Sequence, residues 1–373
     1  MLPRTILFIF GTRPEAIKLC PLALRLKASS ERYQVKICVT GQHREMLDRA
    51  LEAFEVAPDY DLDAMTPGQT LYQSTSRIVA MLEPVLAEAK PALAIVQGDT
   101  TTTLCGSLAA FYSRVPVAHV EAGLRTRDMA QPFPEELNRV LTSRIATLHF
   151  APTQGAADNL AREGVHDRVW ITGNTGIDAV LYIRDRLARG EIESFGKQFE
   201  RKGKRLVLVT AHRRESFGEG FRRVCEALVT LASRGDVHIV YPVHLNPNLR
   251  VPAREYLGAH PDITLTDPVD YAPFVDLMRR AHLILTDSGG IQEEAPSLGK
   301  PVLVLREKTE RPEAVAAGTV KLVGTDPARI VGEAARLLDD PEERQRMSRI
   351  HNPYGDGHAS ERIEQLLREF HMR

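Results

Sequence analysis

Two kinds of chemically useful side chain recur along this sequence, most of them just after a run of apolar residues. The first kind is titratable and could move protons: Asp99, Glu121, Glu135, Glu136 and His212. The second kind is cationic and could hold an anion: Arg13, Lys18, Arg213 and Arg311. Carboxylates that cluster raise one another's pKa, which lets one of them act as an acid or base near neutral pH. Together the two sets suit proton transfer beside a phosphate group.

The stretch DSGGIQEEAPSLGK (287–300) adds a second phosphate signal. It follows a predicted buried strand at 283–286. Ser288 suits a helix N-cap, and the two glycines after it allow a sharp turn or a close approach to a ligand. Free N–H groups at such a helix start attract phosphate, and Glu294 one turn later could accept two hydrogen bonds from a ribose diol. An ordinary strand–turn–helix joint with acids that suit the helix dipole is the competing interpretation.

Composition narrows the class of protein. A chain of 373 residues is expected to form two domains. The net charge of -1 argues against nucleic acid or an anionic membrane as the main partner. The four cysteines show no C-x-x-C spacing, so neither a metal site nor a disulfide framework is expected, and a reducing compartment fits. The apolar run at 6–10 is too short for a signal peptide or membrane span. We therefore expect a cytoplasmic protein.

The elements that must position these residues form two series of strands separated by helix-length segments. The predicted strands are 5–10, 33–40, 91–97, 115–120 and 147–153 in the first series and 204–211, 236–243, 283–290 and 300–307 in the second. Strands that alternate with helices predict parallel sheets covered on both faces. A segment rich in Gly, Asn and Thr at 171–183 separates the series. The pattern predicts an α/β chain of two doubly wound domains, 1–172 and 173–357.

The polar residues gather where the predicted strands end, which is where parallel sheets bind ligands. Any one of them alone would be an ordinary cap or surface group. Those at strand ends are Arg13, Lys18, Gln42, Asp99, Glu121, His212, Arg213, His244 and Ser288. Neither the dinucleotide fingerprint G-x-G-x-x-G after the first strand nor the P-loop pattern G-x-x-x-x-G-K-[ST] occurs, so a dehydrogenase or P-loop enzyme is disfavoured.

Motifs along the whole chain resemble the non-hydrolysing UDP-N-acetylglucosamine 2-epimerases. They are FGTRPEAIKL, TGQHREML, QGDTTTT, HVEAGLRT, PFPEELNR, TGNTGIDA, TAHRRESFG, YPVHLNPN, TDSGGIQEEAPSLGKPVLVLR and TERPEAVAAGTVKLVGTD, in family order. The resemblance implies a glycosyltransferase-B fold: two Rossmann-like domains with the active site in the cleft between them. It also implies that residues 173–357 form the UDP-binding domain and that the last helix, 358–373, crosses back to the first domain.

The activity implied by the resemblance is the interconversion of UDP-GlcNAc and UDP-ManNAc without a cofactor or metal. In the family the sugar loses its C2 proton, UDP is eliminated, and a 2-acetamidoglucal intermediate stays bound until UDP adds back. The implied catalytic residues are Asp99, Glu121, Glu135 and His212. The implied UDP contacts are Arg13, Lys18, His212, Phe274, Ser288, Gly289, Gly290, Glu294 and Arg311. The resemblance also implies a homodimer and a role in supplying cell-surface polysaccharide.

Some family members bind a second UDP-GlcNAc as an activator. Gln42, Glu135, Arg213 and His244 match residues of that site, but Gly68 stands where the activator-binding pattern has an arginine. This departure argues against strict activation by substrate.

Alternatives remain at the level of sequence. One is a 2-epimerase for a modified sugar such as a UDP-2,3-diacetamido-uronic acid. Another is a glycosyltransferase of the same fold, although simple glycosyl transfer does not require acid and base groups on both faces of C2. Glu135 and Glu136 would also suit the positive end of a helix without any catalytic role.

Overall fold

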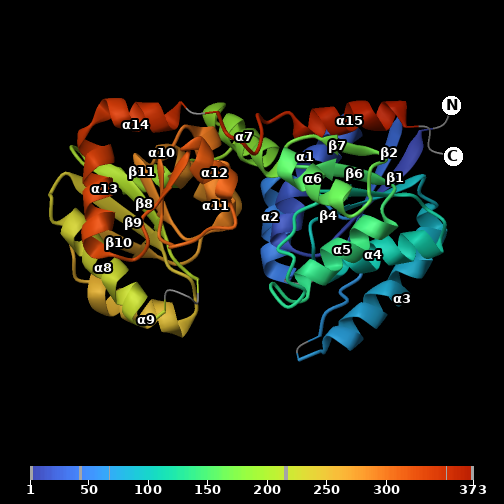
Figure 1. Ribbon diagram of the computed structural model, residues 1–373, viewed down its shortest axis with the longest axis horizontal. Coiled ribbons are helices and arrows are strands. Elements are labelled where there is room, and N and C mark those ends of the chain that lie inside the picture. The colour runs from blue at the N-terminus through green and yellow to red at the C-terminus, as the bar shows by residue number, and fades with distance from the viewer. Residues whose placement is uncertain (1–2, 42–43, 67, 214–216, 350, 371–373) are drawn as a thin grey trace. The chain divides into compact units, whose positions relative to one another are not determined.

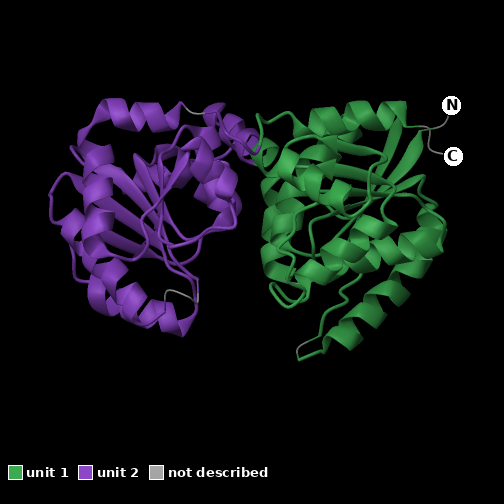
Figure 2. Cartoon of the chain, in the orientation of Figure 1, with its two compact units in different colours: residues 1–179, 355–373 green, residues 180–354 purple. Residues whose placement is uncertain are grey.

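Figure 1 shows the computed structural model of the chain, which describes residues 3–41, 44–66, 68–213, 217–349 and 351–370. The chain divides into two compact units (Figure 2): unit 1 contains residues 1–179 and 355–373, and unit 2 contains residues 180–354. The first division therefore falls at 179/180, whereas the sequence suggested 172/173. Helix α7 (Thr175–Ala188) runs through the observed division, so the polypeptide passes from one unit to the other within a helix.

Unit 1 is built on a parallel sheet with strand order β3-β2-β1-β4-β5-β6-β7. Its strands are β1 (Arg4–Phe10), β2 (Tyr33–Val39), β3 (Tyr60–Asp61), β4 (Leu93–Gln97), β5 (Val117–Val120), β6 (Leu148–Ala151) and β7 (Val169–Ile171). Its helices are α1 (Arg13–Ala28), α2 (Arg44–Ala53), α3 (Leu71–Ala89), α4 (Thr101–Tyr112), α5 (Glu135–Ile145), α6 (Gln154–Arg162), the start of α7, and α15 (Ala359–Glu369). Helices α3, α4 and α5 pack side by side, and α1 lies between α2 and α15 (Figure 1).

Unit 2 repeats the plan with a parallel sheet of order β10-β9-β8-β11-β12-β13. Its strands are β8 (Arg205–Thr210), β9 (Val237–Pro242), β10 (Ile263–Thr266), β11 (Leu283–Thr286), β12 (Val302–Val304) and β13 (Val320–Leu322). Its helices are α8 (Glu219–Ala232), α9 (Pro247–Leu257), α10 (Tyr271–Arg280), α11 (Gly289–Glu294), α12 (Pro312–Ala317), α13 (Pro327–Asp339) and α14 (Pro341–Ser348), with 3-10 turns η1 (Gly196–Phe199) and η3 (Ala295–Leu298). The predicted fold class, two doubly wound α/β domains, is confirmed.

The strands that the sequence did not predict are the four sheet edges, β3, β7, β10 and β13. Edge strands are short and only half-buried, and here their residues are mostly of intermediate exposure. The central strands are buried on both faces, and the run Ile6 to Phe10 in β1 is fully buried. A continuous apolar run therefore marks a central parallel strand but not an edge.

Helix α15 returns the chain to unit 1. Glu364 accepts hydrogen bonds from Arg25 Nε (2.6 Å) and Ser29 Oγ (2.8 Å), both at the end of α1. Asp178 accepts the backbone N–H groups of Ala359 (3.2 Å) and Ser360 (2.7 Å), which are free donors at the start of α15. These contacts bind the last helix beside α1. Within the described ranges, no helix is both long and apolar enough to cross a membrane.

Candidate active site

Each sheet has a point where the strand order reverses, between β1 and β4 in unit 1 and between β8 and β11 in unit 2. At such a point the connections leave toward opposite faces and the carboxyl ends of the two strands frame a crevice. Arg13 and Asp99 follow β1 and β4, and His212 and Asp287 follow β8 and β11. Three predicted site residues, Arg13, Asp99 and His212, therefore lie at the switch point of their unit.

In unit 1 the start of α1 is tied to the start of α4 by a buried carboxylate that the sequence analysis did not single out. Glu15 is 1% exposed, and its Oε2 accepts the N–H and hydroxyl of Thr12 at 2.8 and 2.7 Å. Its Oε1 accepts the hydroxyls of Thr100 (2.7 Å) and Thr103 (3.1 Å). Burial raises the pKa of Glu15, and these hydrogen bonds oppose the rise. The capping box T-x-x-E in the sequence was the available signal.

The hydrogen bonds of Glu15 also fix the positions of two predicted site residues. Arg13 is the first residue of α1, and Asp99 lies immediately before Thr100, the N-cap of α4. Because one carboxylate binds both helix starts, the position of Arg13 relative to Asp99 is set by buried hydrogen bonds. The fixed relation is what a preorganised site requires.

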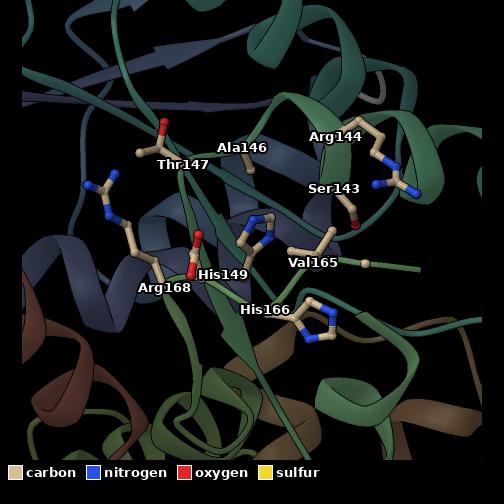
Figure 3. A pocket seen from close by; sticks show the side chains of 10 residues that line it. Ser143, Arg144, Ala146, Thr147, His149, Val165, His166 and Arg168 are labelled. Carbon is tan, nitrogen blue, oxygen red and sulfur yellow. The ribbon is translucent and has the colours of Figure 1, made fainter. Parts of the chain in front are cut away.

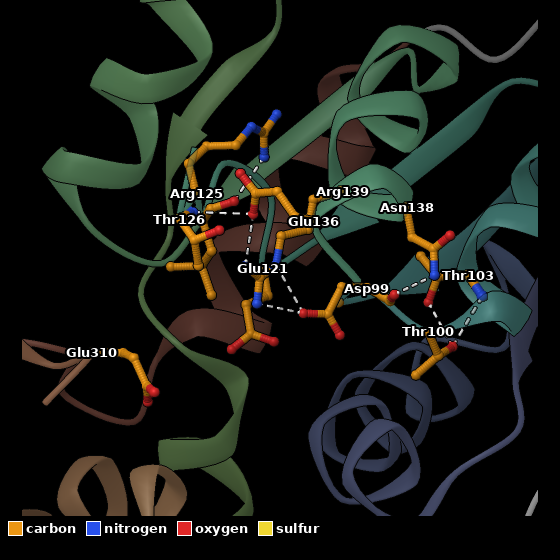
Figure 4. Close-up of polar contacts among 12 residues, drawn as sticks. Asp99, Thr100, Thr103, Glu121, Arg125, Thr126, Glu136, Asn138, Arg139 and Glu310 are labelled. Carbon is orange, nitrogen blue, oxygen red and sulfur yellow. Dashed lines mark hydrogen bonds and ion pairs between the residues drawn. The ribbon is translucent and has the colours of Figure 1, made fainter. Parts of the chain in front are cut away.

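Asp99 is held by helix α5 (Figure 4). Arg139 donates from Nε to Asp99 Oδ2 at 2.8 Å, and its Nη2 lies 2.7 Å from the same oxygen. Asn138 Nδ2 donates to the Asp99 carbonyl at 2.8 Å. Arg139 Nη1 also donates to Glu136 at 2.9 Å, so one guanidinium joins two carboxylates. Sequence reasoning missed Arg139, since nothing in PFPEELNR distinguishes it from a surface arginine.

Glu136 has a structural role in these contacts. Its side chain is 1% exposed and accepts the backbone N–H groups of Thr126 (3.0 Å) and Arg127 (2.8 Å). Burial alone would raise the pKa of Glu136, but these two donors and Arg139 outweigh it and hold the pKa below its usual range. Glu136 thus stays ionised and fastens the 126–127 loop to α5. Its neighbour Glu135, the first residue of α5, is partly exposed.

Glu121 follows β5 in a conformation that L residues rarely adopt. Its φ is 65°, in the left-handed region that costs a non-glycine residue about 1–2 kcal/mol. Its Oε1 lies 2.5 Å from Lys18 Nζ, and its Oε2 accepts a hydrogen bond from Gln97 Nε2. Backbone strain of this kind persists only where the surrounding structure enforces it, and strained residues cluster at functional sites. Lys18, predicted as a UDP contact, is here the partner of a predicted catalytic carboxylate.

In unit 2, His212 is bound by Asp287, a residue within the DSGG motif to which the sequence analysis gave no role. His212 Nδ1 lies 3.0 Å from Asp287 Oδ1. The other carboxylate oxygen, Oδ2, accepts the backbone N–H groups of His212 and Arg213, each at 2.7 Å. The contact arises because β8 and β11 are neighbours with Thr210 opposite Thr286. No sequence signal links residues this far apart in the chain.

The predicted anion cradle lies at the start of α11. A Cβ placed on Gly289 would sit 3.5 Å from Arg311 Nη2 and 3.9 Å from Arg213 Nη2, so two guanidinium groups lie near this glycine. Arg311 also donates from Nε to Glu293. Ser288 occupies the N-cap position as predicted, although its hydroxyl makes no capping hydrogen bond. Helix α11 is short and passes into the 3-10 turn that contains Pro296, since proline cannot extend an α-helix.

Three other predicted residues of unit 2 lie near His212 or the start of α11 in sequence or space: Glu294, Phe274 and His244. Glu294 ends α11 and accepts a hydrogen bond from Tyr271 at 3.3 Å. Phe274 lies one turn further along α10 and is partly exposed. The His244 ring stacks on His212 with centroids 6.2 Å apart and an interplanar angle of 16°.

Of the proposed activator residues that belong to unit 1, Gln42 lies outside the described residues. Gly68 lies before α3 with φ +74°, and an added Cβ there would meet no described atom within 4 Å.

A separate hollow of about 630 Å³ lies in unit 1 (Figure 3). It is lined by His149, His166, Arg144 and Arg168 among others, which lie at the amino ends of β6 and β7 or at the end of α5. Predicted site residues are absent from its lining. The hollow therefore lies at the amino ends of the strands, whereas the candidate active-site residues follow their carboxyl ends.

Comparison with known proteins identifies the family. The family model described as UDP-N-acetylglucosamine 2-epimerase matches residues 25–368. The UDP-N-acetylglucosamine 2-epimerase of Escherichia coli K12 is 57% identical over 370 residues, covering 97% of this chain and 98% of that protein.

Solved structures agree. That of UDP-GlcNAc 2-epimerase from Neisseria meningitidis bound to UDP-GlcNAc is 48% identical, with a TM-score of 0.87, covering 98% of this chain and 100% of the other. The Methanocaldococcus jannaschii enzyme in complex with UDP-GlcNAc and UDP is 34% identical, with a TM-score of 0.77 and the same coverage. A glycotransferase of kitacinnamycin, 14% identical with a TM-score of 0.64, shares the fold alone. The resemblance read from the sequence is thus confirmed: the chain belongs to the UDP-N-acetylglucosamine 2-epimerase family.

Proposed function

We propose that the chain interconverts UDP-N-acetylglucosamine and UDP-N-acetylmannosamine by eliminating and re-adding UDP. Family membership supports the substrate, as does the relative of 48% identity whose structure holds UDP-GlcNAc. One observation carries the chemistry. Asp99 and Glu121 follow the neighbouring strands β4 and β5, and each is held against a cation, Arg139 and Lys18 respectively. Two positioned carboxylates at adjacent strand ends are what proton transfer at two faces of one carbon requires.

The reaction proceeds through 2-acetamidoglucal. A base removes the C2 proton, the C2 electron pair forms the C1–C2 double bond, and the C1–O bond breaks with its electron pair moving to the diphosphate. UDP and the glucal remain bound. UDP then adds back to C1 while an acid delivers a proton to the other face of C2. We assign these proton transfers to Asp99 and Glu121, with Glu135 and His212 as the further proposed catalytic groups.

Unit 2 supplies the contacts proposed for UDP. Arg311 donates a hydrogen bond from Nε to Glu293, and its Nη2 lies near Gly289. Glu293 thus holds one edge of the planar guanidinium, and the edge near Gly289 can pair with the diphosphate. Cations there stabilise the charge that develops on the leaving group. Glu294 is proposed to bind the ribose diol and Phe274 to lie near the uracil. Arg13 and Lys18 of unit 1 are proposed to contact the phosphates as well.

Incubation with UDP-GlcNAc in D₂O, followed by NMR, tests the proposal. The expected product is UDP-ManNAc carrying deuterium at C2. Absence of exchange and of product would refute the substrate, and the same assay with a UDP-2,3-diacetamido-uronic acid would then identify a modified-sugar epimerase. Asp99→Asn is expected to abolish turnover while UDP binding, measured by calorimetry, stays within about threefold of wild type. A variant with near-normal rate would remove Asp99 from the mechanism.

We also propose a homodimer formed through helices α3, α4 and α5. These neighbouring helices expose six large apolar side chains: Leu71, Tyr72, Phe111, Tyr112, Leu137 and Leu141. Leu71 and Tyr72 begin α3 and Phe111 and Tyr112 end α4, and their exposure on contacting helices supports an interface there. Sedimentation velocity is expected to give a dimer that Phe111→Glu shifts to monomer. A monomeric wild-type protein would contradict this proposal.

A further inference from the structure

We propose that Asp287 is a positioning residue for His212, holding a proton on Nδ1 so that only Nε2 exchanges a proton with the substrate. The inference rests on the proposed function, in which His212 acts on the UDP-sugar.

The geometry places one carboxylate oxygen on the histidine's main chain and the other at ion-pair distance from its ring. Asp287 Oδ1 lies 3.0 Å from His212 Nδ1, and Oδ2 accepts the His212 backbone N–H at 2.7 Å. The Arg213 N–H reaches the same Oδ2 at 2.7 Å. Contacts to both the main chain and the ring leave the imidazole little freedom to rotate or withdraw. A base that is itself oriented by a third group is the recurring arrangement in acid–base catalysis.

Asp287 is itself firmly placed. It is 1% exposed, and its N–H donates to the Thr210 carbonyl at 3.1 Å. The hydroxyls of Thr210 and Thr286 lie 2.7 Å apart, which joins the ends of β8 and β11 beneath the carboxylate. Because both strands are central in their sheet, this support is rigid. The carboxylate therefore holds the ring at a position set by the core of unit 2.

The charge state of Asp287 decides which nitrogen carries the hydrogen. Burial would raise its pKa, but His212 and the two backbone N–H donors outweigh burial and lower it. An ionised carboxylate only accepts hydrogen bonds, so the facing Nδ1 must be the donor. His212 then carries hydrogen on Nδ1 in both its neutral and its cationic form. Nε2 remains the atom that gains and loses a proton.

The stacked ring of His244 has the opposite arrangement. Its Nδ1 accepts the backbone N–H of Asn246 at 3.1 Å, so its neutral form carries hydrogen on Nε2. Asp287 places its negative charge against the His212 ring, whose other neighbours include Arg213 and the stacked His244. The His212 side chain is 41% exposed, which leaves it accessible to a ligand. Asp287 thus stabilises the imidazolium that would donate from Nε2 to the leaving diphosphate.

Histidine tautomers in the wild-type protein test the inference directly. Long-range ¹H–¹⁵N spectra of protein labelled at histidine distinguish the two neutral forms, and His212→Asn and His244→Asn identify the resonances. The expected result is hydrogen on Nδ1 of His212 and on Nε2 of His244. A neutral His212 with hydrogen on Nε2 would overturn the proposal. This measurement needs no turnover, so failure of the proposed reaction would leave it standing.

Asp287→Asn tests the consequence for chemistry. The amide removes the carboxylate charge that faces Nδ1 of His212. We expect kcat to fall by about 10² or more, with the KM for UDP-GlcNAc within about threefold. Asp276→Asn is the matched control, because Asp276 is a buried aspartate that accepts a backbone N–H from Gly196 in the same unit. An unchanged kcat in folded Asp287→Asn would overturn the proposal. If that variant does not fold, the wild-type tautomers still decide.

Discussion

Replacing Arg139 by methionine isolates the ion-pair network that holds Asp99. Arg139 bonds Asp99 and Glu136 at once, and these side chains are 16%, 29% and 1% exposed. Removing one partner of a buried ion pair costs about 3–5 kcal/mol because it leaves a charge uncompensated. Since Asp99 is partly exposed to water, we take the lower end, about 3 kcal/mol. For a unit of this size that corresponds to a melting temperature lower by about 6–12 °C.

The dependence on pH follows from Glu136, whose folded pKa lies below its usual range. Stability contributed by such a carboxylate is present above its unfolded pKa and is lost as pH falls through the folded one. The difference between wild type and Arg139→Met is therefore expected to be largest near pH 7. It should shrink as the pH falls toward and through the folded pKa of Glu136.

Thermal and urea unfolding across pH 3–8 measure this effect, and Arg144→Met is the control. Arg144 lies in the last turn of the same helix, and its guanidinium makes no ion pair or hydrogen bond with a described residue. Its loss removes only a helix-dipole contribution of about 0.3–1 kcal/mol. Equal losses of stability in the two variants would refute the reasoning. So would a loss in Arg139→Met that does not change with pH.

Three further predictions concern other residues. Glu121→Gly should be more stable than Glu121→Ala by about 1 kcal/mol in urea unfolding, because only glycine adopts φ 65° without strain; the reverse order would contradict the strain. Asp178→Ala removes the acceptor for two N–H groups at the start of α15, so unfolding should cost about 1–2 kcal/mol less and proteolysis should release the C-terminal helix faster; unchanged cleavage would count against this docking contact. Glu294→Ala should weaken UDP binding more than it lowers kcat, since a ribose contact persists through the reaction; lost rate with unchanged UDP affinity would argue against that role.

The sequence by itself determined the fold class and where candidate site residues lie along the chain. Central parallel strands are covered on both faces, so runs such as 6–10 and 283–285 must be apolar and are visible without a structure. In each sheet the carboxyl ends of the parallel strands lie together, which makes Asp99 and Glu121 in unit 1 and His212 in unit 2 candidates before any coordinates are known. The edge strands were not predicted from the sequence, because half-buried residues do not form continuous apolar runs.

Only the tertiary structure decided which partners these residues have. Asp287 binds His212, Arg139 binds Asp99, and Glu15 reaches Thr100, all across long stretches of chain. The chain has 48 basic and 49 acidic residues, so composition offers far more pairings than the protein uses. Strand register, helix packing and burial select among them, because a carboxylate leaves water only where positioned donors replace it. The identity of the candidate catalytic groups is local information, whereas their charge, orientation and support belong to the fold.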